Sequence, residues 1–348
     1  MLDLLVQNAF DFLRKAKSEI VTAPKFSIIS FHTAVELLLK ARLMHEHWSL
    51  VVSPRQEPDW KKFVAGDFQS VSLKNAAERL NNVIGIGLSN KEMKSFTEIS
   101  RHRNKAVHFF HIDHSKEDNT EQVNLIVKEQ LTAWFFLHNL LVNKWQSVFD
   151  RWKAEINELD RELKSIHTYL QVVFDQNQAE IQKVIQAGKI VKKCPSCNFE
   201  ANVHSPLNDK PYDSACLICG LTQRVLRISC PTCNEEVEFV NEGFGSCDSC
   251  STTFDPKTVA GLLIDEGGAY ISAKEGDYNA YEGNCSDCDG YHTVVRTEDD
   301  SWICAGCLIM VDKINFCGWC NEANTGDMEM SFISGCNYCD GRGGWERE

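Results

Sequence analysis

Sixteen cysteines, all in C-x2-C pairs, constrain this chain more than any other feature of its sequence. Residues 1–193 contain no cysteine, and the eight pairs all lie within residues 194–348. In a reducing compartment such pairs indicate metal ligands rather than disulfides. Each C-x2-C turn, or knuckle, presents two thiolates, and two knuckles complete the tetrahedral shell that Zn²⁺ prefers in structural sites.

Consecutive knuckles combine into four units, which we name ribbons 1 to 4: residues 194–219, 230–250, 285–307 and 317–339. Each ribbon would hold one structural zinc ion with no open position for catalysis. Zinc binding would supply much of the folding free energy of units this small. The predicted ligands are Cys194, Cys197, Cys216, Cys219, Cys230, Cys233, Cys247, Cys250, Cys285, Cys288, Cys304, Cys307, Cys317, Cys320, Cys336 and Cys339.

The spacing predicts a duplicated double ribbon, with one pair over 191–250, a connector over 251–284 and a second pair over 285–348. Period-2 segments such as Glu236–Val240 and His292–Arg296 are suitable hairpin strands. An interleaved arrangement, in which the first knuckle shares a metal with the third, stays open. The last knuckle, Cys336-Asn-Tyr-Cys-Asp-Gly-Arg-Gly343, resembles the zinc repeat of DnaJ-type chaperones, and we interpret it as a glycine-dependent turn.

Charge divides the chain at the same place as the cysteines. Residues 1–193 have a net charge of +4 and residues 194–348 a net charge of −17, which together give −13. Phosphate backbones are bound by Lys and Arg, so ribbons this acidic are poor nucleic-acid readers. A protein partner for the ribbons is the better expectation.

The cysteine-free half is predicted to be an all-α bundle over 1–148, so the fold class is a helical bundle followed by small β zinc modules. Residues 26–44 are apolar nearly all round, as in the central helix of a bundle. We expect a loop over 49–66 and shorter helices over 70–82 and 90–110. The apolar stretch from Leu131 to Val142 is too short to cross a bilayer. Without a signal-peptide pattern at Met1, a soluble cytoplasmic protein is expected.

Residues 149–190 carry a heptad pattern typical of a long helix that forms a coiled coil. Its seam could pair with a second chain or pack back onto the same bundle, because periodicity does not identify the partner. The seam residues, spaced alternately by three and four, are Phe149, Trp152, Ile156, Leu159, Leu163, Ile166, Leu170 and Val173.

The segment from Glu98 to Phe110 contains Arg103-Asn104-x3-His108. Together with the helix of residues 31–44, this motif resembles the HEPN family, helical domains found in RNA-cleaving toxins, antiviral effectors and CRISPR nucleases. The resemblance covers roughly residues 1–150. It implies a metal-independent endoribonuclease with Arg103, Asn104 and His108 in its site, a homodimer, and a role in bacterial defence or as a toxin.

The chemistry of these residue types agrees with that implication. RNA cleavage by attack of the 2′-hydroxyl needs a proton acceptor or donor that titrates near neutral pH, as histidine does, and a fixed cation such as arginine to bind the phosphate oxygens. The expected products carry a 2′,3′-cyclic phosphate and a 5′-hydroxyl. On an ideal helix Arg103 and His108 are about 140° apart and do not share a face. The resemblance implies that a dimer meets this difficulty, with two motifs facing each other across one cleft. Arg101 shares a face with His108 and is the alternative arginine.

Other interpretations of the same residues stay open. The run of His108, His111 and His114 could hold a metal, or could be an exposed helix end. Glu36 could orient the site or pair with Lys40. The whole chain could be a non-catalytic scaffold whose helical half dimerises and whose ribbons recruit a protein. A chaperone-like ribbon protein is a third reading, based on the last knuckle alone.

Overall fold

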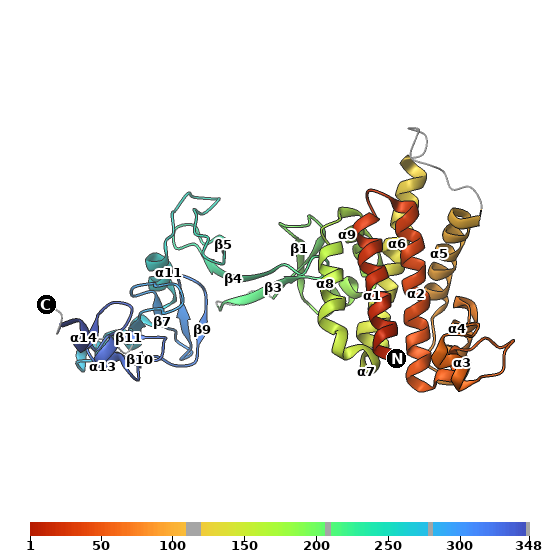
Figure 1. Ribbon diagram of the computed structural model, residues 1–348. Coiled ribbons are helices and arrows are strands. Elements are labelled where there is room, and N and C mark those ends of the chain that lie inside the picture. Colours follow the sequence, from red (N-terminus) through yellow and green to blue (C-terminus); the bar gives the residue numbers. More distant parts are fainter. Residues whose placement is uncertain (109–119, 206–209, 278–280, 346–348) are drawn as a thin grey trace. The chain divides into compact units, whose positions relative to one another are not determined.

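A computed structural model describes residues 1–108, 120–205, 210–277 and 281–345. The chain forms two compact units, Met1–Gln178 and Ala179–Glu348 (Figure 1). The first unit is helical, and the second consists of short antiparallel strands around clustered cysteines. The helical half followed by small β modules, as expected from the sequence, is therefore confirmed. In the described residues, no helix is both long and apolar enough to cross a membrane.

The helical unit is built around α2, which is buried along most of its length. α1 packs along α2, and α4, α5 and α6 contact α2 as well. Residues 49–66, expected to be a loop, contain a 3-10 helix over Trp48–Val51 and α3. The helices of this part of the chain are α1 Leu2–Glu19, α2 Pro24–Glu46, α3 Trp60–Ala65, α4 Leu73–Arg79, α5 Asn90–His108, α6 Thr120–Asn139, α7 Gln146–Phe149, α8 Lys153–Leu163, α9 His167–Gln176 and α10 Gln178–Gln186.

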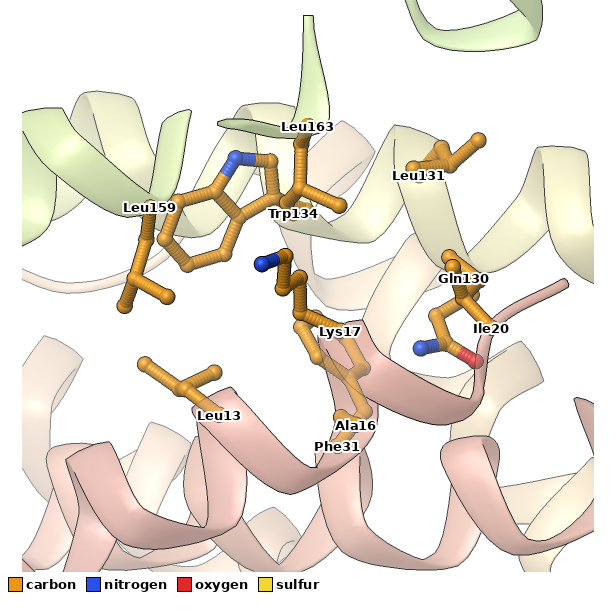
Figure 2. A pocket seen from close by; sticks show the side chains of 10 residues that line it. All are labelled: Leu13, Ala16, Lys17, Ile20, Phe31, Gln130, Leu131, Trp134, Leu159 and Leu163. Atoms are coloured by element: carbon orange, nitrogen blue, oxygen red, sulfur yellow. The ribbon is translucent and has the colours of Figure 1, made fainter. Parts of the chain in front are cut away.

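The continuous heptad helix expected over 149–190 is not formed. The helix is interrupted after α7 and again at Ile166. The backbone of Ile166 is extended rather than helical, with φ of −89° and ψ of 112°. Leu159 and Leu163 of the seam point into a small apolar cavity that Leu13 of α1 and Trp134 of α6 also line (Figure 2). The seam therefore packs back onto the bundle of its own chain, and a coiled coil is not supported.

A buried carboxylate explains why the seam folds back. Asp160 of α8 accepts hydrogen bonds from Nε1 of Trp134 at 3.0 Å and from the hydroxyl of Tyr169 at 2.5 Å. Its other oxygen lies 3.0 Å from Nζ of Lys164. Burial raises the pKa of Asp160, but His138, Tyr169 and Lys164 lower it more, so the pKa lies below its usual value. The carboxylate joins α6, α8 and α9, which a straight helix could not do.

The second unit contains three antiparallel sheets with the strand orders β1-β2-β3-β4-β5, β6-β7-β8-β9 and β10-β11. The strands are β1 Ile190–Lys193, β2 Glu200–His204, β3 Tyr212–Cys216, β4 Thr222–Ser229, β5 Glu236–Val240, β6 Glu282–Gly283, β7 Val294–Arg296, β8 Trp302–Cys304, β9 Met310–Val311, β10 Asn315–Phe316 and β11 Ala323–Asn324. The helices are α11 Pro256–Leu263, α12 Glu266–Lys274, α13 Ser331–Ser334 and α14 Gly341–Trp345. The hairpin strand expected over 236–240 is present as β5, and β7 covers part of the one expected over 292–296.

Neighbouring ribbons are joined in pairs. The long strand β4 leaves ribbon 1 and enters ribbon 2, so these two ribbons share one sheet. Ribbons 3 and 4 are joined at Asn284, whose backbone N–H donates to the backbone carbonyl of Ala323 at 2.7 Å. The segment 251–284 is more than a connector, because Val259, Ala260 and Leu263 of α11 share one apolar core with ribbons 2 and 3.

Candidate functional site

The cysteines gather into four clusters that match consecutive pairing of the knuckles. Within each described cluster the sulfur atoms lie within 4.8 Å of one another, and none of these cysteines forms a disulfide. The interleaved arrangement is therefore excluded. Each set of four belongs to one ribbon, as the sequence predicted.

The sulfur positions fit a zinc ion. Distances between sulfurs of facing knuckles are 3.6 Å in ribbons 1 and 2, 3.6 and 3.8 Å in ribbon 3, and 3.7 Å in ribbon 4. A tetrahedron of thiolates at the usual Zn–S distance has sulfurs about 3.8 Å apart. A disulfide would bring them to about 2.05 Å. The four clusters fit four structural zinc ions, which would stabilise the folded ribbons when bound.

Seven of the eight knuckles share one backbone turn, in which the residue after the second cysteine has a positive φ. In six of them its amide donates to the carbonyl of the first cysteine at 2.8–3.0 Å. Asn, Asp and Gly tolerate this left-handed conformation best. The residues are Asn198, Gly220, Asn234, Ser251, Asp289, Leu308 and Asn321.

The eighth knuckle differs, and so does the ribbon that contains it. Its turn relies on Gly335 and Gly341, with φ of +78° and +62°, and a Cβ added at either glycine would collide with backbone atoms. This confirms the glycine-dependent turn expected from the sequence. In ribbon 4 Cys320 is exposed, whereas each other ribbon has at least two buried cysteines and none exposed.

In the helical unit, Arg103 and Asn104 line a cavity of about 330 Å³. Both come from the C-terminal half of α5, and Nη1 of Arg103 donates to Oδ1 of Asn104 at 3.0 Å. The opposite wall is His32 and Glu36 of α2, with the start of α4. The structure thus brings two of the three motif residues to a polar cavity.

His108 is not among the described residues that line this cavity. It is the last residue of α5 and is exposed. Arg101, the alternative arginine, is also exposed and pairs with Glu98 at 2.6 Å on the same helix. His111 and His114, the other members of the proposed metal-binding run, lie outside the described residues.

His32, which the sequence motif did not single out, also lines the cavity and is only 6% exposed. Its Nε2 lies 3.0 Å from Oγ of Ser100 on α5, and its Nδ1 lies 3.8 Å from Oε2 of Glu36. The other oxygen of Glu36 accepts the amide hydrogen of Leu73 at 3.2 Å. The signal available in the sequence was that His32 lies one helical turn before Glu36, the acid in an otherwise apolar helix.

The pKa of His32 lies below its ordinary value, so the neutral imidazole predominates at pH 7. Burial lowers the pKa of His32, and Arg103 and Lys40 lower it further against the opposing effect of Glu36. Burial also lowers the pKa of Lys40. The cavity therefore combines a fixed cation, a neutral imidazole and a carboxylate, which is a set that can bind an anion and transfer a proton.

Comparison with known proteins finds no match: no family model, no curated protein and no solved structure is similar to this chain.

Proposed function

We propose that the helical unit is a metal-independent endoribonuclease of HEPN type, acting in the cytoplasm in defence or as a toxin, and that the ribbons are its protein-docking or sensing module. The observation that carries the proposal is the cavity lined by Arg103 and Asn104 of α5 and, from α2, by the buried His32 and the partly buried Glu36. Arg103 would hold the scissile phosphate, and Asn104 would orient the guanidinium through their hydrogen bond. His108 would transfer a proton.

The position of His108 makes a homodimer part of the proposal. Arg103 and His108 point about 140° apart on one helix, so a single copy does not bring both to one phosphate. A second copy related by a twofold axis would place its own His108 at the cavity.

The first test is cleavage of total RNA and a tRNA pool by the purified full chain during a brief exposure to EDTA. Wild type should release 2′,3′-cyclic phosphate ends, indifferent to EDTA. Arg103→Ala and His108→Ala should each lower the rate by at least about 100-fold, as expected for loss of a phosphate clamp or a proton-transfer group. His45→Ala, at an exposed position, is the control and should retain the activity. Arg101→Ala tests the alternative arginine and should retain the activity if Arg103 holds the phosphate.

Co-expression of the two inactive variants tests the shared site. In a random mixture half of the dimers are mixed, and each mixed dimer keeps one intact site, so about a quarter of the wild-type activity should return. No recovery with confirmed mixed dimers would contradict a site shared between chains.

The acidic second half favours one alternative, a non-catalytic dimeric scaffold. Its net charge of −17 suits a basic protein partner better than a nucleic acid. RNA binding that survives His108→Ala without any cleavage by wild type would support this scaffold over the nuclease.

A further inference from the structure

The cavity contains a Ser–His–Glu arrangement that lies outside the Arg103–His108 motif. Ser100 precedes Arg103 by one turn on α5, and His32 precedes Glu36 by one turn on α2. All four residues line the same cavity. A hydroxyl within hydrogen-bond reach of an imidazole, with a carboxylate behind it, is the arrangement that activates a hydroxyl as a proton acceptor.

The contact between His32 and Ser100 is compatible with either tautomer of His32, and the carboxylate of Glu36 favours the one with the proton on Nδ1. Nδ1 is buried and has no hydrogen-bond partner, and the carboxylate of Glu36 lies 3.8 Å from it. A proton on Nδ1 points toward that carboxylate, whereas a lone pair there would be repelled by it. With the proton on Nδ1, Nε2 can accept the hydroxyl hydrogen of Ser100 when that hydrogen turns away from the carbonyl of Phe96.

We propose that Ser100 and His32 form the proton-accepting arm of the site, with Ser100 touching the substrate and His32 acting through it. This assignment rests on the proposed ribonuclease function. The RNA 2′-hydroxyl would give its proton to Oγ of Ser100, while Ser100 gives its own proton to Nε2 of His32. The O2′–P bond forms, the P–O5′ bond breaks, and the 5′-oxygen takes a proton from His108 of the partner subunit. His32 then loses its proton to solvent, and His108 regains one.

The charged groups facing His32 suit this role. Glu36 and Lys40 come from α2, Lys74 from the start of α4, and Arg103 from α5. An RNA phosphate on Arg103 would offset the positive charge that disfavours protonated His32. Substrate binding would thus prepare His32 to accept the proton.

The structural alternative is that the hydroxyl of Ser100 only makes a hydrogen bond within its own helix. Its Oγ also lies 3.0 Å from the carbonyl of Phe96, one turn back, a common bond for a helical serine. On that alternative Ser100→Ala would leave cleavage unchanged. Thr132 of α6 makes the same kind of bond to the carbonyl of Lys128 at 2.8 Å and is not among the described residues that line this cavity, so Thr132→Ala is a matched control.

The test is the pH dependence of kcat/KM for RNA cleavage by the full zinc-loaded chain. Wild type should give a bell-shaped profile whose acid limb reports the proton acceptor and whose alkaline limb reports the proton donor. His32→Gln, which keeps a hydrogen bond to Ser100, should lower kcat by about 100- to 1,000-fold and remove the acid limb, with RNA affinity unchanged. His108→Ala should remove the alkaline limb instead. Ser100→Ala should lose activity and Ser100→Thr should restore it.

The outcomes separate this assignment from the proposed function. If wild type cleaves RNA but His32→Gln keeps the acid limb, or Ser100→Ala cleaves as fast as Thr132→Ala, the assignment is overturned and the ribonuclease stands. If wild type does not cleave RNA, both are overturned. Should His32→Gln fail to fold, Ser100→Ala decides the matter, because alanine favours the helix.

Discussion

The backbone after each zinc knuckle places a specific demand on single residues. Asn198 in ribbon 1 is exposed and has φ of 63°, so its conformation rather than its burial explains the residue type. Asn198→Gly should leave zinc binding by ribbon 1 unchanged, while Asn198→Val should cost about 1–2 kcal/mol because a β-branched side chain is strained there. The zinc affinity of ribbon 1 is measured by competition with a chelator, and alkylation of Cys194 reports when the zinc has left. Equal zinc affinity of the Gly and Val variants would contradict it, and Glu200→Val in β2 is the control.

Asp160 is the residue on which the fold of the helical unit depends most. Asp160→Ala leaves three buried or half-buried donors unpaired and should lower the free energy of unfolding at pH 7 by about 3 kcal/mol, measured in urea. Because the pKa of Asp160 is lowered in the fold, its contribution is present above the unfolded pKa and is lost as pH falls through the folded pKa. The difference in unfolding free energy between Asp160→Ala and wild type should be constant from pH 5 to 8 and should become smaller below about pH 4. The exposed Asp175→Ala should cost less than about 1 kcal/mol.

Among the elements, α8 shows what the heptad seam does. Leu159 is 4% exposed and borders the cavity of Figure 2, so Leu159→Ala enlarges a void already present. We expect a loss of about 2–5 kcal/mol in unfolding free energy with no change in oligomeric state. Urea unfolding and analytical ultracentrifugation measure the two quantities. Dissociation of a dimer at unchanged monomer stability would show instead that the seam joins two chains. Leu4→Ala, at a side chain that is 74% exposed, is the control.

Ribbon 4 is the zinc site that should open first. It has an exposed cysteine, two-residue strands in β10 and β11, and the one described knuckle without the shared turn. A colorimetric chelator should therefore release one zinc in four in a fast phase, and Cys320 should be alkylated before the cysteines of ribbon 2. Cys320→Ser should remove the fast phase and leave the other three zinc ions bound. Release of all four at one rate would disagree with this order.

At the scale of the whole molecule, charge suggests that the ribbons restrain the helical unit. Residues 1–193 carry +4 and the remainder −17, and the zinc-bound thiolates would make the second half more acidic still. A fragment of residues 1–190 contains the whole helical unit, and it should cleave RNA faster than the full chain at low salt. The difference should shrink as salt screens the attraction. Equal rates at low salt would exclude electrostatic restraint.

The extent of agreement between sequence and structure differs between the two units. In the ribbons, spacing alone predicted the clusters, because a ligand pair two residues apart is a local feature and zinc accepts few geometries. In the helical unit, the helices expected over 26–44 and 90–110 correspond to α2 and α5, but the break at Ile166 was not expected. A heptad pattern reports an apolar face without identifying its partner, and here Asp160 draws α8 and α9 onto the same chain.

The candidate active site shows the same division. The motif singled out Arg103, Asn104 and His108 from their types and spacing, and only the packing of α2 against α5 placed His32, Glu36 and Ser100 beside the first two. His32 and Ser100 are 68 positions apart, so no local pattern could relate them. The sequence by itself determined the zinc ligands and the helical character of the first half, because these follow from short-range geometry, whereas the consecutive pairing of the knuckles was settled by the clusters in the structure. The tertiary structure decided which side chains share a cavity and which face the seam covers, because such contacts join residues far apart in the chain.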